Sequence, residues 1–174
     1  YLKRLVIGGF ERVYEINRNF RNEGISTRHN PEFTMLEFYC AHQDYHYAMD
    51  MVEEMFRTVI QEACGVLQVP FGEYQLDFAK PFTRLRMKDA VMQYGKFTEA
   101  DITPDNIDAL LKKYGSKEIP KGASWGEKLF FLFEEVAEKH LIQPTFIIDF
   151  PVEVSPLAKC DPANKAFVAR FELS

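Results

Sequence analysis

The sequence has few cysteines and no spacing that would join them. Cys40, Cys64 and Cys160 are the three cysteines in 174 residues, and no two of them form a C-x-x-C pair. An odd, scattered set of this kind speaks against both a disulfide framework and a zinc knuckle. The cysteine content therefore indicates a reducing, cytoplasmic setting.

Long apolar runs and an excess of basic charge are also missing. No apolar stretch reaches the ~18 residues that a membrane-spanning helix needs, and no signal peptide is visible. The net charge of −5 does not supply the basic face with which general nucleic-acid binders hold phosphate backbones. We therefore expect no membrane association and no general nucleic-acid binding by this chain alone.

The remaining composition is that of a globular protein. Hydrophobic residues make up 47% of the chain and include 16 Phe and eight Tyr, which predict a well-filled core and an aromatic-lined site. The length suffices for one domain with a sizeable core, or for one domain with an insertion. The chain begins at Tyr1 without methionine and stops inside an expected strand, so we expect it to be a fragment of a longer protein.

Period-two patterns predict a long antiparallel hairpin near the N-terminus. Residues 10–21 and 33–41 alternate as strands do, and the Gly, Ser, Asn and Pro of residues 24–31 predict a turn between them. One face of the second strand is expected to lie almost entirely in the core; it consists of Thr34, Leu36, Phe38 and Cys40.

Downstream, the pattern predicts helices, a short hairpin and two further strands. Apolar spacing indicates an amphipathic helix from the N-cap Asp44 to Ala63, with Gly65 ending it. Ser124 and Glu127 form a capping-box pattern at the start of a later helix. The other expected elements are a hairpin over 66–78, a connector at 80–82, helices over 87–94, 106–114 and 124–140, and strands over 145–150 and 167–173.

These elements predict an α+β fold, in which an antiparallel β-sheet is flanked by helices and carries a small helical insertion. Residues 1–94 are expected to form a core with the hairpin and its packing helix. Residues 95–140 are expected to form an inserted helical subdomain, because the chain becomes more polar and richer in Pro and Gly over 95–123. Residues 141–174 are expected to return to the core.

The second strand of the hairpin places a carboxylate among apolar and aromatic side chains. Glu37 shares a face with Met35 and Tyr39, where an anion is costly unless it meets a cation. The hairpin is expected to present on one surface Arg21, Glu23, Phe33, Glu37 and Tyr39, with His29 and Asn30 in the loop above. From spacing alone, a solvated sheet face with surface ion pairs is an equally good interpretation.

The same stretch resembles a known motif. Phe20-Arg21-Asn22-Glu23, a loop, Arg28-His29-Asn30-Pro31-Glu32-Phe33 and then Glu37 resemble the second signature motif of class II aminoacyl-tRNA synthetases. Thr34-Met35-Leu36-Glu37-Phe38-Tyr39 is similar to the lysyl-tRNA synthetases of subclass IIb, as are residues 1–19, 144–146 and 151–158. The resemblance is weakest over 95–123. It implies the central part of a class II catalytic core, ending before the third motif.

The resemblance implies ATP-dependent activation of lysine to lysyl-adenylate and its transfer to tRNA(Lys) by a cytoplasmic homodimer that uses Mg²⁺. Arg21 is the implied catalytic residue, bridging the α-phosphate and the attacking lysine carboxylate. The implied roles are ATP binding by Arg21, Glu23, His29, Asn30 and Phe33, lysine binding by Arg21, Glu37 and Tyr39, and magnesium binding by Glu172.

Three other functions stay open. The chain could belong to an aspartyl- or asparaginyl-tRNA synthetase, to a paralogue that transfers lysine to protein, or to a non-enzymatic binding module with the same fold. Glu37 with Tyr39 favours lysine over aspartate, whose side-chain carboxylate calls for cationic partners. Because the family's first and third motifs are expected to lie outside this sequence, we expect the chain alone not to form lysyl-adenylate.

Overall fold

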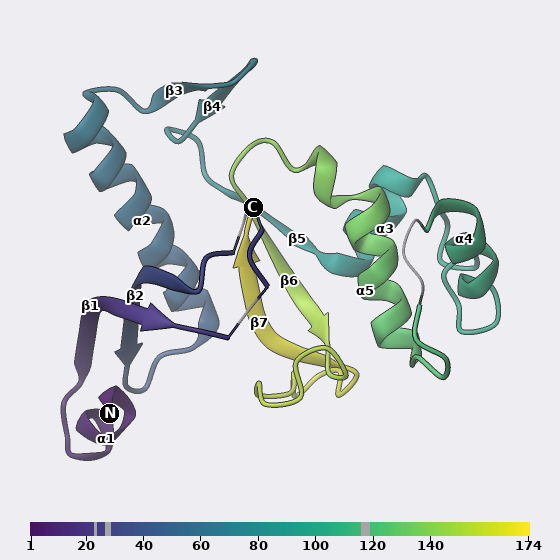
Figure 1. Cartoon of the computed structure of the whole chain (residues 1–174), viewed down its shortest axis with the longest axis horizontal. Helices are drawn as coiled ribbons and strands as arrows, with labels where there is room; N and C mark the ends of the chain where they lie inside the picture. Colours follow the sequence, from purple (N-terminus) through teal and green to yellow (C-terminus); the bar gives the residue numbers. More distant parts are fainter. Residues whose placement is uncertain (23, 27–28, 116–118) are drawn as a thin grey trace. The chain divides into compact units, whose positions relative to one another are not determined.

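The structure, a computed structural model, describes residues 1–22, 24–26, 29–115 and 119–174. Its internal contacts separate the chain after Asp44 into a first unit, Tyr1–Asp44, and a second unit, Tyr45–Ser174. Figure 1 colours the first unit purple to dark blue, and each unit is described by itself below. Among the described residues, no helix is long and apolar enough to cross a lipid bilayer.

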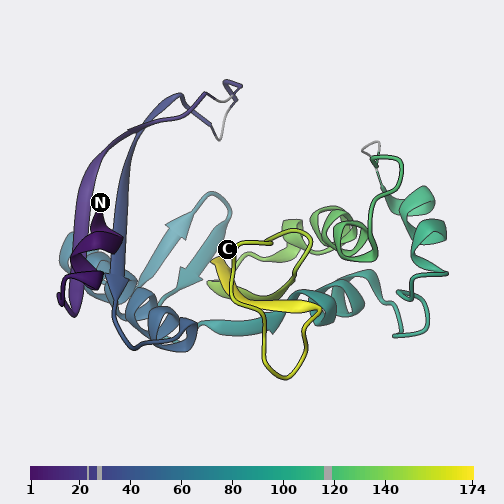
Figure 2. The ribbon, with the colours of Figure 1, turned by 90° about the horizontal axis from the view of Figure 1, so that it is seen from below.

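The first unit consists of one helix and one hairpin. Helix α1, Leu2–Ile7, precedes β1, Arg12–Phe20, which pairs antiparallel with β2, Glu32–Cys40. Figure 2 shows the two strands running side by side along their length. The predicted hairpin is confirmed, with strand limits that differ from the prediction by one or two residues. Helix α1 has no predicted counterpart, because six residues are too few for a periodic pattern.

The two faces of the hairpin differ in exposure. Tyr14, Ile16 and Phe20 are between 65% and 72% exposed, whereas Val13 and Glu15 on the opposite face are half-buried. The Lys3 ammonium group lies over the ring of Tyr39. Helix α1 therefore covers part of the face that carries Val13, Glu15, Glu37 and Tyr39, called the Glu15 face below. One short helix and two strands cannot cover both faces.

The predicted core face of β2 is therefore wrong within this chain. Thr34 is exposed and Leu36 is 38% exposed, while Phe38 and Cys40 are half-buried. The alternation of side chains was predicted correctly, but alternation does not tell which of two mixed faces is covered.

The second unit is built on a three-stranded mixed sheet. Strand β6, Thr145–Pro151, lies between β5, Thr83–Arg86, and β7, Phe167–Leu173. It pairs antiparallel with β7, and the α+β class with antiparallel strand pairs is confirmed. Its pairing with β5 is parallel, so the sheet of this unit is mixed and differs in this pair from the predicted antiparallel sheet. The four residues of β5, Thr-Arg-Leu-Arg, are too polar and too few to predict a strand.

The predicted helices and the second hairpin are confirmed. The helices are α2, Tyr45–Cys64, α3, Met87–Gly95, α4, Ile107–Tyr114, and α5, Trp125–Val136, followed by the 3₁₀ turn η1, Glu138–His140. The hairpin is β3, Gln68–Phe71, with β4, Tyr74–Asp77. Gly65 follows α2 with φ +73°, as the prediction of a left-handed helix end requires. The capping box of Ser124 and Glu127 is formed in both directions. The predicted limits of the inserted subdomain stay a prediction.

Two clusters of buried side chains lie against the sheet. Phe146 packs with Met49 of α2, whereas Ile147 and Phe150 pack with residues of α3 and α5 such as Leu129. Simple alternation would put Phe150 on the Phe146 side. A register shift between Ile148 and Phe150, with φ +58° at Asp149, turns it to the other side.

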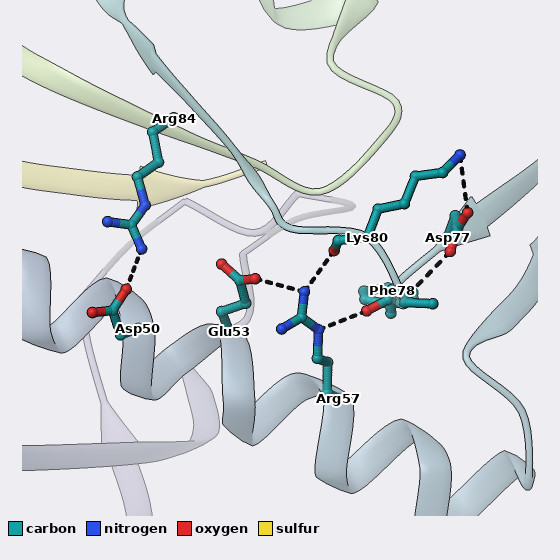
Figure 3. A network of polar contacts seen from close by, with 8 residues as sticks. Asp50, Glu53, Arg57, Asp77, Phe78, Lys80 and Arg84 are labelled. Carbon is teal, nitrogen blue, oxygen red and sulfur yellow. Dashed lines mark hydrogen bonds and ion pairs between the residues drawn. The ribbon is translucent and has the colours of Figure 1, made fainter.

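One arginine fastens α2 to the segment that follows the second hairpin. Arg57 donates to the carbonyl oxygens of Phe78 at 2.9 Å and Lys80 at 2.7 Å, and pairs with Glu53 at 2.7 Å (Figure 3). The Glu53 side chain is 11% exposed, so the pair is largely removed from solvent. This cluster fixes the path of the chain into β5.

Candidate functional site

The Glu15 face of the first hairpin carries most of the predicted site. The register puts Glu15 opposite Glu37 and Asn19 opposite Phe33, and the Arg21 backbone N–H donates to the Pro31 carbonyl. The guanidinium of Arg21 lies 5.2 Å from the centroid of the Phe33 ring. The structure thus brings Arg21, Phe33, Glu37 and Tyr39 to one face, as predicted.

Tyr39 and Glu37 form a hydrogen-bonded pair. The Tyr39 hydroxyl donates to Oε1 of Glu37, two residues away on the same face. This hydrogen bond is the main reason that the pKa of Tyr39 is raised, with burial and the negative charges of Glu37 and Glu15 adding to it. The phenol therefore stays protonated well above neutral pH, and because its proton is donated to Glu37, its oxygen remains available as an acceptor.

Glu15 is a member of this face that sequence reasoning missed. It is half-buried directly across from Glu37, so two carboxylates face the same space. Like charges at directly opposed positions repel unless a cation lies between or beside them. The period-two pattern of β1 contains the signal, but pairing Glu15 with Glu37 requires the register, which the sequence does not give.

The loop between β1 and β2 contains the other predicted ATP contacts. The Ser26 hydroxyl lies 3.0 Å from Nδ1 of His29, and the backbone groups of the two residues bond each other in both directions. Asn30 follows as an exposed residue. Glu23 lies outside the described residues. His29 is thus held by a local turn, at the base of the loop next to β2.

Glu172 lies in the second unit, near the end of β7. It pairs across the sheet with Ile147, its side chain is 51% exposed, and it forms an ion pair with Arg170. No group of three or more His, Cys, Asp or Glu side chains converges as a metal cage in the described parts of the chain. Mg²⁺ usually takes one or two carboxylates and completes its shell with phosphates and water. A single exposed carboxylate such as Glu172 fits a site of that kind.

A second acidic residue of this unit has an unusual environment. Asp149 pairs with Arg86 at 3.3 Å, and burial of the carboxylate raises its pKa although Arg86 opposes this shift. Its positive φ belongs to the irregular turn of β6 that redirects Phe150. We therefore interpret Asp149 as a structural residue that shapes β6.

The chain is similar to known proteins over its whole length. Residues 1–174 match the family described as tRNA synthetases class II (D, K and N). The chain is 53% identical over 175 residues to the heat-inducible lysine–tRNA ligase of Escherichia coli K12, covering 99% of this chain and 34% of that protein. The lysine–tRNA ligase of Pasteurella multocida is 51% identical over 177 residues, covering 99% of this chain and 35% of that protein.

The regions of similarity include both the hairpin of the first unit and the sheet of the second unit. The chain spans about a third of the length of the curated relatives that it matches. A match over every residue, together with identity above one half, is far more than a shared fold requires. The chain belongs to the class II tRNA synthetase family that includes the D, K and N enzymes.

Proposed function

We propose that the synthetase containing this chain activates lysine with ATP to give lysyl-adenylate and pyrophosphate, and then transfers the lysyl group to tRNA(Lys). The relatives named lysine–tRNA ligases support this function. The observation that carries it is the anionic face formed by Glu15, Glu37 and Tyr39 next to Arg21 and Phe33. An amino acid with two ammonium groups is the substrate that such a face suits.

The lysine subsite in this proposal is the Glu37–Tyr39 pair. Glu37 takes the α-ammonium group, because a half-buried carboxylate needs a cationic partner. The hydroxyl oxygen of Tyr39 accepts a hydrogen bond from the ε-ammonium group, since its own proton is already donated to Glu37. Because the pKa of Tyr39 is raised, the phenol stays protonated and uncharged in this arrangement.

The ATP subsite is formed by Phe33 and Arg21. The ring of Phe33 stacks on adenine, and Arg21 bridges the α-phosphate and the lysine carboxylate. A carboxylate oxygen attacks the α-phosphorus, a new C–O–P link forms, and the bond to the bridging oxygen of pyrophosphate breaks. No protein nucleophile takes part, so positioning and charge neutralisation by Arg21 supply the rate increase. His29, Asn30 and Glu23 complete the ATP contacts.

Magnesium belongs to the same proposal. Glu172 would hold Mg²⁺ together with the ATP phosphates, and the ion would neutralise charge that develops on the leaving pyrophosphate. The wider proposal is a class II catalytic core acting as a homodimer in the cytoplasm. Three free thiols at Cys40, Cys64 and Cys160 support a reducing compartment.

The aspartyl and asparaginyl members of the family are the nearest alternative. The side-chain carboxylate of aspartate would face Glu15 and Glu37, which would repel it, whereas the neutral side-chain amide of asparagine would form no ion pair with them. The charge of the face therefore favours lysine, although the family itself includes all three substrates.

ATP–pyrophosphate exchange by the complete synthetase tests the proposal. We expect exchange that depends on lysine, and a Glu37→Gln variant with a Michaelis constant for lysine raised by about 100-fold, the loss of one charge-assisted contact. Leu36→Ala, on the opposite face of β2, is the matched control and should leave that constant unchanged. Absence of lysine-dependent exchange in the unmodified enzyme would overturn the function. Normal lysine affinity in Glu37→Gln would overturn the subsite.

A further inference from the structure

Arg170 of β7 has an unusually complete set of contacts for a side chain near a sheet edge. Its guanidinium lies 4.5 Å from the centroid of the fully buried Phe150 ring. It also donates to the Ser155 hydroxyl oxygen and to Oε1 of Glu172. The three partners come from β6, from the segment after it and from β7, so one side chain connects three parts of the chain.

The segment that carries Ser155 is itself fixed. Successive turns bond the Val154 N–H to Pro151, the Ser155 N–H to Val152 and the Ala158 N–H to Ser155. The start of α5 packs tightly against the beginning of this segment, because a Cβ atom at Gly126 would clash with the Glu153 side chain and lie only 2.6 Å from Cβ of Pro151 at the end of β6. The Ser155 hydroxyl is therefore a fixed acceptor for the arginine.

We propose that Arg170 is a positioning residue that orients the Glu172 carboxylate for the magnesium ion of the bound nucleotide. This inference rests on the proposed function, in which Glu172 holds that ion. Arg170 and Glu172 are two residues apart on one strand, so their side chains share a face. The planar fork of a guanidinium can hold Ser155 and Glu172 at once, whereas an ammonium group cannot do so with fixed geometry.

The contacts that hold the Arg170 guanidinium separate this pair from an ordinary surface ion pair. Exposed pairs contribute little, because both side chains must give up their freedom to meet. Here the Phe150 ring and the Ser155 hydroxyl already hold the guanidinium, and Arg170 is 34% exposed. Glu172, at 51% exposed, is the partner whose orientation the guanidinium fixes. Partners that orient a metal-binding carboxylate commonly contribute strongly to metal affinity.

The sign of the effect distinguishes positioning from simple charge competition. A positive charge beside Glu172 repels a cation, so competition alone predicts tighter magnesium binding when Arg170 is removed. Positioning predicts the opposite, because a freely rotating carboxylate loses orientation.

The experiment is calorimetric titration of ATP into the complete synthetase, without lysine, at a series of Mg²⁺ concentrations. Arg170→Met should raise the Mg²⁺ concentration for half-maximal ATP binding by about tenfold, and Arg170→Lys by less. Arg84→Met is the matched control: Arg84 lies on β5 of the same sheet, is also 34% exposed, and pairs with a carboxylate, Asp50. It should leave the Mg²⁺ requirement unchanged.

A double-mutant cycle with Glu172→Gln completes the test. Glu172→Gln should raise the Mg²⁺ requirement by itself, and adding Arg170→Met to it should raise it no further. An unchanged or lower requirement in Arg170→Met alone, or an equal further rise in the double variant, would overturn the role of Arg170. An unchanged requirement in Glu172→Gln would instead remove Glu172 from the magnesium site, and with it this inference. Lysine-dependent exchange would still test the proposed function separately.

Discussion

The two units of the chain bury their side chains very differently. In Tyr45–Ser174, side chains such as Leu129, Phe146 and Phe150 are completely buried in two clusters. In the described part of Tyr1–Asp44, Leu2 is the one buried hydrophobic side chain. Yet the first unit carries the side chains that we assign to lysine and to most of ATP. Within this chain, stability and substrate recognition depend on largely different residues.

The largest expected effect is on the stability of the second unit. Leu129→Ala should lower the free energy of unfolding by about 4 kcal/mol, because it leaves a cavity beside α3 and β6. Leu36→Ala, the same change at a 38% exposed position in the first unit, should cost less than about 1 kcal/mol. Urea unfolding followed by circular dichroism measures both. Equal losses would show that the two units do not differ in packing.

Arg21→Ala should show the reverse pattern. We expect lysine-dependent ATP–pyrophosphate exchange to fall by at least about 100-fold, or about 3 kcal/mol, because charge on the α-phosphate and carboxylate is no longer bridged. The urea midpoint should hardly change. Arg18→Ala is the control, since Arg18 is 73% exposed, points to the other face and pairs with Glu32 at 3.3 Å. A loss of stability in Arg21→Ala as large as its loss of rate would favour a structural role.

Arg57→Met tests whether polar contacts add to the stability of the second unit. The variant removes two bonds to backbone carbonyls and leaves Glu53 without its cation, so we expect a loss of about 2 kcal/mol. Lys80→Met removes the ion pair between Asp77 and a lysine that is 78% exposed, and Asp77 keeps its hydrogen bonds from Gln68 and Ala79, so the variant should cost less than about 0.5 kcal/mol. If the two variants were equally stable, the half-buried position of Arg57 and its bonds to backbone carbonyls would not add to the stability of the second unit.

Phe33→Leu tests the first unit by a smaller change in binding. Loss of stacking should raise the Michaelis constant for ATP by about tenfold, or about 1.4 kcal/mol, while that for lysine stays within a factor of about two. Steady-state exchange at varied ATP measures it. Phe20→Leu, on the opposite face of the hairpin, should leave the constant for ATP unchanged. An unchanged constant in Phe33→Leu would exclude the stacking role.

The smallest expected effect concerns the start of α5. Ser124→Ala removes the N-cap and should cost about 1 kcal/mol at neutral pH. The pKa of Glu127 is lowered, mainly because its carboxylate accepts the Ser124 backbone N–H and also the hydroxyl. A lowered pKa means that the charged carboxylate stabilises the fold above its unfolded pKa, and that this contribution is lost as pH falls through the folded value.

Glu127→Gln isolates that pH dependence. The variant should unfold at lower urea than the parent at pH 7, and the gap should close as the pH falls below 4.5, the ordinary pKa of a glutamic acid. Urea midpoints at several pH values measure this. A gap that stayed constant down to pH 3 would exclude the charge of Glu127 as its cause.

Much of the fold could be predicted because its elements are local in sequence. The alternation of β1 and β2, the apolar spacing of α2 and the Ser124–Glu127 capping box are each visible within about 20 residues. The shared face of Arg21, Phe33, Glu37 and Tyr39 follows from the same alternation.

The features that could not be predicted depend on pairing between distant residues. Glu15 and Glu37 are visible in the sequence, but that they lie opposite each other follows only from the strand register. Strand β5 is too short and polar to be recognised before it pairs with β6. The irregular turn at Asp149 places the Phe150 side chain on the opposite side of the sheet from the one that simple alternation predicts. In that position the ring contacts the guanidinium of Arg170.

The most direct test of the anionic hairpin face is its choice of amino acid. ATP–pyrophosphate exchange by the complete synthetase should be measured with lysine, aspartate and asparagine at equal concentrations. We predict exchange with lysine that exceeds exchange with either of the others by at least about 1,000-fold, because the anionic face attracts the side-chain ammonium of lysine, repels the side-chain carboxylate of aspartate and forms no ion pair with the neutral amide of asparagine. Faster exchange with aspartate or asparagine than with lysine would contradict the assignment.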